Sequence, residues 1–463
     1  MFLALATAGC IARLFSNWVY DDPFITYRYA QNLAHGLGFV YNPGERILST
    51  TTPFFTLLLA AFYLVWPNLP LVANVIGAAS LATGAFLLWD LAHTWQAPCA
   101  GWVALGLYPS FVLALSTLGS ETPLYLAFCI GAFAAHARSR RHLTAVLSAL
   151  ALLTRGDGVL VAGLIAADFL IRFIRERQPI PWSAIALYAG LAAPWFLFAA
   201  WYFGTPLPVT LAVKQQQGLM AISQRFAPGF LRIIGWYWRW NYGLVAALAV
   251  AGMIESVVRS RPWLVFLLWP IIYFAAYTLL GVSGYFWYYA PLVPGFIMAA
   301  GLGVHILWTA LQRWQRERSI IAIGLMVLAL FQVRDAWQTA QNLDSRYSIY
   351  RAVGEWLEAH TAPTASIGAL EVGIIGYYAQ RSMIDFAGLI QPDVAKQFNL
   401  NATYQDSARW AMARYRPDYL VLNPAWFPDL LLSKVLPACQ VVTTFSGESY
   451  RYAGDLTIYQ CPK

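Results

Sequence analysis

Two adjacent carboxylates, Asp21 and Asp22, follow the first apolar segment of the chain and precede Pro23. Carboxylates at the end of a membrane span are costly unless they are solvated, paired or used in chemistry. An Asp followed by Pro and an amphipathic run is typical of a helix start, with Asp22 as N-cap. A carboxylate that accepts backbone N–H groups is a poor base. We therefore expect Asp22 to be a rigid anchor and Asp21 the candidate general base; the plainer alternative is a helix cap beside a solvated acid.

Four further charged side chains adjoin apolar segments. Glu121 precedes a helical run, Arg155 and Asp157 separate two short runs, and Lys214 follows another. Transfer of a group to a hydroxyl needs a base for the hydroxyl and cationic or hydrogen-bonding groups for an anionic leaving group. Each residue also has a structural alternative: capping for Glu121, an ion pair for Arg155 with Asp157, and snorkelling to the lipid surface for Lys214.

Four more residues complete the candidate set for substrate binding. Arg28 follows Asp22 on the same expected helix and is either a ligand of the substrate or solvated. Tyr288 and Tyr289 belong to the aromatic run GYFWYY, which suits stacking on a sugar or an isoprenoid but also an aromatic belt at the membrane surface. Glu371 lies in the C-terminal region.

Metal and cofactor signals are weak. The six His residues show no ligand spacing, which argues against a histidine-based metal site. We assign no metal ligands and no cofactor. Coordination of Mg²⁺ or Mn²⁺ by Asp21, Asp22 and Glu121 alone stays open.

The composition indicates a membrane protein. Of 463 residues, 59% are hydrophobic and 11% are charged, whereas soluble domains carry about 25% charged residues. The net charge of +8 comes from short Arg clusters between apolar runs and follows no nucleic-acid recognition motif. We therefore expect membrane lipids, and no nucleic acid, among the partners.

Apolar runs of near-spanning length predict about eleven membrane crossings. Short cytoplasmic loops collect Lys and Arg, and four Arg clusters fit one side only if the TRGDG sequence at 154–158 turns outward between two short spans. This places the N-terminus in the cytoplasm and the C-terminal region outside the plasma membrane. The expected spans are 1–18, 70–94, 101–118, 123–137, 143–155, 157–171, 181–203, 243–258, 263–281, 290–312 and 319–335.

Two other segments are long enough to fold. Residues 19–69, the first external loop of a transmembrane domain spanning 1–335, predict a surface helix that ends at Gly36 and a second one after Pro53. Residues 336–463 alternate helical patterns with strand-like runs and predict a soluble α/β domain. Its expected helices are 346–360 and 405–415, and its expected strands are ASIGAL, SMIDF, YLVL and LTIY.

Two of the five cysteines, Cys439 and Cys461, lie in this polar C-terminal region. They could form a disulfide in an oxidising compartment. Their spacing alone leaves the pairing open.

The stretch DDPFITYRYAQNLAHGLGFVYNPGERILSTTTP resembles the first external loop of the GT-C class of membrane glycosyltransferases. The likeness is to bacterial relatives of the mycobacterial arabinofuranosyltransferases and, more distantly, to protein O-mannosyltransferases. Shorter matches follow in the same order along nearly the whole chain: SETPLYLAF, LLTRGDGVLVA, FGTPLPVTLAVK, YFWYYAP and IGALEVGIIGYYAQRSMIDFAGL.

The resemblance implies an inverting enzyme that moves a sugar from a polyprenyl-phosphate carrier to an acceptor on the outer face, with an acidic first-loop residue as base. The acceptor, whether glycan, lipid or protein, is not specified. Two departures bear on substrate specificity: RGDG at 155–158 replaces Arg-Pro-Asp-Gly, and STTTP at 49–53 replaces Gly-Tyr-Thr-Ser-Pro.

Two other classes of function share some of these features. A transporter or flippase of lipid-linked sugars would have the spans and a polar chamber, but transporters usually carry polar residues near the midplane and related halves. A membrane scaffold would explain the C-terminal domain but not the external charged groups. We therefore predict a glycosyltransferase.

Overall fold

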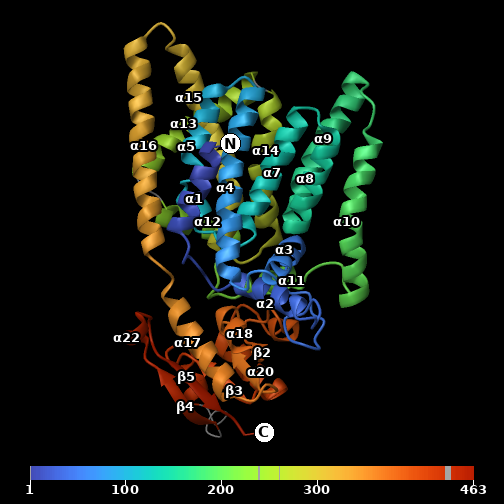
Figure 1. The fold of residues 1–463 in the computed structure, drawn as a ribbon, viewed down its shortest axis with the longest axis vertical. Helices are drawn as coiled ribbons and strands as arrows, with labels where there is room; N and C mark the ends of the chain where they lie inside the picture. Colours follow the sequence, from blue (N-terminus) through green and yellow to red (C-terminus); the bar gives the residue numbers. More distant parts are fainter. Residues whose placement is uncertain (1, 238–239, 260, 433–438, 463) are drawn as a thin grey trace.

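A computed structural model describes residues 2–237, 240–259, 261–432 and 439–462. A tall bundle of helices stands on a smaller α/β domain, and short helices lie between the two (Figure 1). The architecture is that of a polytopic helical membrane protein.

Ten of the eleven expected apolar runs overlap a single helix of the bundle. Five apolar helical stretches among the described residues are long enough to cross a membrane: Leu69–Thr94, Trp182–Phe203, Pro262–Leu280, Phe286–Ala310 and Arg318–His360. The bundle helices are α1 (Phe2–Leu14), α4 (Leu69–Thr94), α5 (Pro98–Leu107), α7 (Thr122–Ala137), α8 (Arg141–Thr154), α9 (Val159–Glu176), α10 (Trp182–Phe203), α13 (Trp240–Arg259), α14 (Arg261–Leu280), α15 (Val293–Ala310) and α16 (Gln315–Gln341).

The third expected span is not one continuous helix. The run 101–118 contains α5, which ends at Leu107, and the one-turn helix α6 (Val112–Leu115). Pro109 lies between them and lacks the N–H that would continue the helical hydrogen bonding. The expected span at 101–118 is therefore built from two helical segments and not from one helix.

The break at TRGDG is confirmed. A single 3-10 turn, η1 (Gly156–Gly158), separates α8 from α9. A Cβ on Gly158 would lie 2.5 Å from the backbone carbon of Ala151, so the tight turn needs glycine there. The two short helices can therefore reverse direction at this point.

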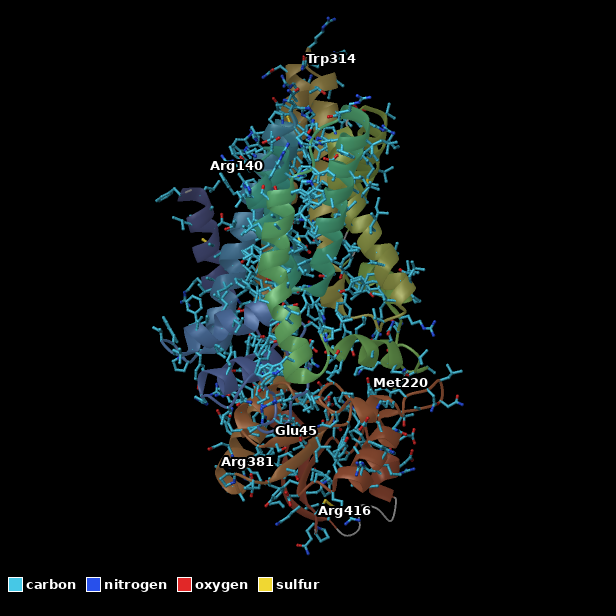
Figure 2. The ribbon with its side chains drawn as sticks, turned by 90° about the vertical axis from the view of Figure 1, so that its right-hand side faces the viewer. Glu45, Arg140, Met220, Trp314, Arg381 and Arg416 are labelled. Carbon is cyan, nitrogen blue, oxygen red and sulfur yellow. A yellow bond between two sulfur atoms is a disulfide. The ribbon has the colours of Figure 1, made fainter. Side chains whose placement is uncertain are left out.

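Two of the Arg clusters lie at the end of the bundle away from the α/β domain. Arg140 and Trp314 mark this end, whereas Glu45 in the first loop and Arg381 and Arg416 in the C-terminal domain lie on the opposite side of the molecule (Figure 2). The side chains of Arg259 and Arg261, which form a third cluster, lie outside the described residues.

The segments between bundle and domain begin with proline-started helices, as expected. Chain direction changes after α2 at Gly36, whose φ of +75° favours glycine. The helix α12 was not predicted. These elements are α2 (Pro23–Ala34), α3 (Pro53–Tyr63), α11 (Thr210–Gln217), α12 (Phe226–Tyr237), η2 (Phe286–Tyr288) and η3 (Ala290–Leu292).

The C-terminal domain has a five-stranded sheet of order β2-β1-β3-β5-β4, with β1 parallel to β2 and β3 and with β5 antiparallel to β3 and β4. The four expected strands and both expected helices are confirmed; β4 was missed. The elements are α17 (Ser345–His360), β1 (Ser366–Ala369), α18 (Ile374–Ala379), β2 (Ser382–Asp385), α19 (Pro392–Ala395), α20 (Tyr404–Tyr415), β3 (Tyr419–Leu422), α21 (Pro428–Leu432), β4 (Gln440–Phe445), α22 (Gly447–Tyr450) and β5 (Leu456–Gln460).

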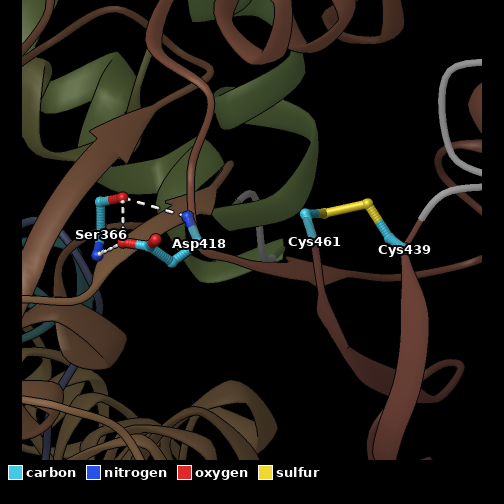
Figure 3. The surroundings of a disulfide bond; sticks show 4 residues. All are labelled: Ser366, Asp418, Cys439 and Cys461. Carbon is cyan, nitrogen blue, oxygen red and sulfur yellow. Dashed lines mark hydrogen bonds between the residues drawn. A yellow bond between two sulfur atoms is a disulfide. The ribbon is translucent and has the colours of Figure 1, made fainter. Parts of the chain in front are cut away.

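Two cross-links join neighbouring strands of this sheet near their ends (Figure 3). Cys439, before β4, forms a disulfide with Cys461, after β5. The Asp418 carboxylate accepts the backbone N–H and the hydroxyl of Ser366, each at 2.9 Å, and ties the starts of β1 and β3 together. The helix α16 continues past residue 335, so the expected domain boundary falls inside it.

Candidate active site

A cavity of about 660 Å³ lies where the bundle meets the intermediate segments. Its wall is formed by the start of α2, the loop before α3, the start of α7, the α8–α9 turn, α11 and η2. Six of the ten expected site residues line it: Asp22, Glu121, Arg155, Asp157, Lys214 and Tyr288.

Asp21 faces away from this cavity and toward the C-terminal domain. Its Oδ1 accepts the N–H of Ile374 at 2.7 Å and its Oδ2 accepts the N–H of Gly373 at 3.2 Å. The side chain is buried. Asp21 is thus the anchored carboxylate of the pair, because its oxygens are held by the first N–H groups of α18.

Asp22 has the opposite environment. Its backbone is already helical, with φ of −55° and ψ of −43°, and its side chain makes no capping hydrogen bond. Side-chain capping requires an extended backbone at the N-cap, so the expectation that Asp22 caps α2 was wrong. In the described part of the chain, no donor hydrogen-bonds to the Asp22 carboxylate, which lines the cavity. The geometry therefore favours an exchange of the two expected roles.

Arg155 is the centre of a buried charged network. Its Nη2 lies 2.9 Å from Asp157 Oδ2 and its Nη1 lies 3.2 Å from Glu121 Oε1. The Tyr277 hydroxyl donates to the same Asp157 oxygen at 2.8 Å. Burial raises the pKa of the Glu121 carboxyl, and the Arg155 charge opposes this rise. The expected ion pair of Arg155 with Asp157 is therefore present, and it forms part of the cavity wall.

Lys214 is a buried cation of a different kind. Its side chain is only 4% exposed, which does not fit snorkelling into solvent. Its Nζ lies 4.0 Å from the ring centre of Tyr285, a contact that stabilises a cation. Burial lowers the pKa of the Lys214 ammonium. The neighbouring Tyr285 and Asp22 raise this pKa by more than burial lowers it, so it lies above its ordinary value. Among the described residues, no carboxylate lies within ion-pair distance of Lys214.

Three other expected site residues do not line the cavity. Arg28 is buried and donates to the carbonyl oxygens of Tyr41, Gly376 and Arg381. The Tyr289 hydroxyl donates to the Phe226 carbonyl at 2.7 Å.

Glu371 lies 3.7 Å from Arg346, measured between Oε1 and Nη1, and beside Asp21. The structure therefore does not bring Arg28, Tyr289 and Glu371 to the cavity: they join parts of the protein, and their partners are backbone groups or other charged side chains.

The sequence analysis missed several residues of the cavity wall. They are hydroxyl and aromatic side chains: Tyr20, Thr26, Ser49, Thr50, Thr51, Thr52, Ser120, Thr210, Tyr277 and Trp287. One signal was available for four of them, Ser49 to Thr52, because STTTP departs from the expected pattern there.

The three acids considered for Mg²⁺ or Mn²⁺ do not converge. Asp21 is bound by backbone N–H groups of α18, and Glu121 is paired with Arg155. Over the described ranges, no group of three His, Cys, Asp or Glu side chains is placed to hold a metal ion. The donor set in the wall therefore does not fit an acid-only cation site.

Comparisons with known proteins bear on the fold. Residues 335–459 match the family model DUF8728, described as a domain of unknown function. No curated protein matches the chain in sequence. ArnT from Cupriavidus metallidurans in the apo state has a TM-score of 0.66 at 13% identity, covering 99% of this chain and 97% of that chain. The same protein bound to undecaprenyl phosphate has a TM-score of 0.61 at 13% identity, with the same coverage.

The archaeal oligosaccharyltransferase AglB from Archaeoglobus fulgidus, in complex with an inhibitory peptide and a dolichol-phosphate, has a TM-score of 0.63 at 13% identity. The likeness covers 100% of this chain and 74% of that chain. The chain has the GT-C fold. The expected GT-C-like bundle with a C-terminal α/β domain is thereby confirmed, and the cavity lies in the part of the GT-C fold that the first loop helps to build.

Proposed function

We propose that this protein is an inverting glycosyltransferase that moves a sugar from a polyprenyl-phosphate carrier to an acceptor hydroxyl at the outer face of the membrane. One observation carries the proposal: the Asp22 carboxylate, with no donor attached among the described residues, lines the same cavity as the buried cations Lys214 and Arg155. The proposed base and the proposed phosphate-binding cations thus face the same cavity.

The reaction follows from these roles. The acceptor oxygen attacks the anomeric carbon while its proton passes to Asp22, and the bond between that carbon and the phosphate oxygen breaks. The phosphate leaves on its carrier with both electrons of the bond. A single displacement at carbon inverts its configuration.

Lys214 is the principal ligand of the departing phosphate. Arg155 is already close to two carboxylates, Asp157 and Glu121, which offset most of its charge. Lys214 contacts the Tyr285 ring, and the carboxylates whose charge acts on it, Asp22 and Asp385, lie beyond ion-pair distance among the described residues. A cation held in a buried site stabilises developing negative charge more than one in water.

The remainder of the wall suits an isoprenoid chain. Helices α8, α9, α10 and α14 contribute apolar side chains to it. The cavity volume falls within the range of about 300–1,000 Å³ typical of small-molecule sites. Two solved structures with this fold hold undecaprenyl phosphate and dolichol-phosphate, which supports a lipid-linked donor here. The apolar residues are Leu152, Val159, Leu160, Trp195, Phe196, Leu207, Leu211, Ala276 and Leu280.

Turnover tests the proposal directly. Purified protein is incubated with undecaprenyl phosphate carrying mannose, glucose, galactose or arabinose, together with a cell-envelope extract as acceptor, and released undecaprenyl phosphate is measured. We expect release from at least one donor. A transporter would bind these lipids and leave the sugar–phosphate bond intact, and that result would contradict the proposal.

The phosphate role of Lys214 has a matched control. Lys214→Met is expected to weaken binding of undecaprenyl phosphate about 10- to 150-fold, because a charge-assisted hydrogen bond is lost. Lys396→Met removes an exposed lysine of the C-terminal domain and should bind as the wild type does. Equal binding by the two variants, both folded, would exclude Lys214 from the phosphate site.

The orientation in the plasma membrane is part of the proposal. The disulfide Cys439–Cys461 suits an oxidising compartment, and the opposite end of the bundle carries Arg140 (Figure 2). In a background without Cys10 and Cys99, a cysteine at Asn342 should react with an impermeant maleimide in intact cells and one at Ser139 should not. The reverse pattern would invert the topology.

A further inference from the structure

One wall of the cavity carries a group of buried hydroxyl side chains, which we call the hydroxyl patch: Thr26, Ser49, Thr50 and Thr52. Thr26 comes from α2, and the other three come from the loop before α3. Each of them is at most 8% exposed, and each lines the cavity. The STTTP departure noted in the sequence therefore lies in the wall of the proposed active site.

The hydroxyl patch has hydrogen-bonding capacity that the protein does not use well. Thr50 and Thr52 hydroxyl oxygens are 3.0 Å apart, but Thr26 lies 3.3 Å from the first and 3.4 Å from the second. Hydroxyl–hydroxyl bonds are usually about 2.7–2.8 Å long. The backbone N–H of Thr52 lies 3.4 Å from the Thr50 hydroxyl oxygen. The Ser49 hydroxyl oxygen has almost no accessible surface and, within the described residues, no hydrogen-bond partner. A buried polar group without a good partner is costly, so the three threonine hydroxyls, whose mutual contacts are mostly long, can gain better hydrogen bonds from a ligand.

The hydroxyl patch adjoins the proposed base. Asp22 and Thr26 are four residues apart in the helical backbone that continues into α2, and residues at this spacing share a helix face with about 5–6 Å between their Cβ atoms. The charged groups come from other walls, since Arg155 lies after α8 and Lys214 lies on α11. A ligand at the patch therefore sits beside the reacting hydroxyl and the anomeric carbon.

The chemistry of the patch selects one class of ligand. Each threonine or serine hydroxyl both donates and accepts a hydrogen bond, which matches the ring hydroxyls of a sugar. The patch itself contains no charged side chain, whereas anions are usually bound by Arg, Lys or backbone N–H groups.

We propose that the hydroxyl patch is the subsite that holds the ring hydroxyls of a neutral sugar during transfer. This inference rests on the proposed function and adds to it that the group beside Asp22 is a neutral carbohydrate. Two sources have this chemistry, the sugar of the donor and a sugar of the acceptor.

Binding and transfer by a triple variant test the inference. Thr26→Val, Thr50→Val and Thr52→Val keep the shape of the side chains and remove their hydroxyls. The matched control replaces the same three residues by Ser, which keeps them. Thermal unfolding in detergent confirms that both proteins are folded. The probes are undecaprenyl phosphate alone and the same lipid carrying mannose, glucose, galactose or arabinose.

We expect the wild type and the Ser control to bind the preferred sugar-bearing lipid more tightly than the bare lipid. In the Val variant, the ratio of the affinity for the sugar-bearing lipid to that for the bare lipid should fall by about tenfold or more, as expected for two or three lost hydrogen bonds. Its affinity for bare undecaprenyl phosphate should be unchanged. That result assigns the patch to the donor sugar. If donor binding and donor hydrolysis are kept and only transfer to the acceptor is lost, the patch holds the acceptor sugar.

Wild-type sugar preference together with wild-type transfer in the Val variant would overturn the inference. Failure of the proposed function is distinguished from this outcome, because the wild type itself would then bind no undecaprenyl phosphate and release none from any donor. That failure would overturn both proposals before any variant is compared.

Discussion

Asp21 and Asp22 are neighbours in sequence but belong to two regions with different chemistry. Asp21 belongs to the joint, by which we mean the contact of Asp21, Arg28, Tyr41 and Asn42 with residues 372–383 of the C-terminal domain. Asp22 belongs to the cavity. In the joint, buried polar groups have close partners across the contact, whereas the cavity contains a carboxylate and hydroxyls whose bonding capacity is not filled. Unfilled hydrogen-bonding capacity, more than charge alone, distinguishes the candidate site from the joint.

The joint is formed by direct hydrogen bonds and a close approach of two backbone segments. The Tyr41 hydroxyl donates to the Val372 carbonyl at 2.5 Å, and Asn42 exchanges two hydrogen bonds of 2.9 Å with the backbone of Met383. A Cβ on Gly376 would lie 1.9 Å from the Tyr41 hydroxyl, so the close approach requires glycine. The first loop and the C-terminal domain also share one hydrophobic core. The joint therefore holds Asp21 in place, and through the chain it fixes Asp22 at the cavity.

The strongest test of the comparison exchanges each acid for its amide. Asp22→Asn is expected to lower the transfer rate about 10²- to 10⁴-fold, the typical cost of losing a general base, while binding of undecaprenyl phosphate is kept. Asp21→Asn should retain much of the transfer rate, because its carboxylate faces α18. Turnover is measured with equal folded amounts of each variant. A dead Asp21→Asn enzyme of wild-type stability beside an active Asp22→Asn enzyme would restore Asp21 as the base.

A second prediction concerns the joint itself. Arg28→Met removes a buried cation that donates to three carbonyl groups. We expect the free energy of unfolding to fall by at least about 3 kcal/mol, since each such bond contributes about 1.5–3 kcal/mol. Thermal unfolding and limited proteolysis of the C-terminal domain report the change. Arg409→Met, on the exposed face of α20, is the control. Equal stability of the two variants would contradict the stabilising role of Arg28 in the joint.

The prediction with the smallest expected effect concerns Asp385, which lies between the joint and the cavity. The Asp385 carboxylate accepts the N–H groups of Ala387 and Leu389, and Leu389 lines the cavity. Burial raises the pKa of Asp385 from 3.8 to about 6. The folded protein then binds more protons than the unfolded chain between these values, so the free energy of unfolding falls as pH rises from about 4 to about 6. The loss is at most about 3 kcal/mol.

Asp385→Asn cannot titrate and should flatten the pH dependence of thermal stability over this window. A profile identical to that of the wild type would show that Asp385 titrates at its ordinary pKa. The same window measured with Asp22→Asn should keep the wild-type shape, because that substitution does not touch the Asp385 loop.

Much of the fold could be predicted from the sequence. The apolar runs, the TRGDG break, the proline-started helix α2 and four of the five strands follow from hydropathy, proline and residue preference, which act over a few neighbouring residues. The break within the run 101–118 was missed because Pro109 was given too little weight. β4 was missed because its pattern, with mostly exposed residues, lacks the buried alternation that marks a strand.

The sequence by itself determined which acids and bases adjoin the membrane surface, because a charged residue at the end of an apolar run is visible in the order of residues. Only the tertiary structure decided what each one does. Asp21 meets Ile374, and Arg28 meets Gly376 and Arg381, across about 350 positions of chain. Such contacts determine which carboxylate is bound by N–H groups and which remains open to a substrate, and no local pattern records them.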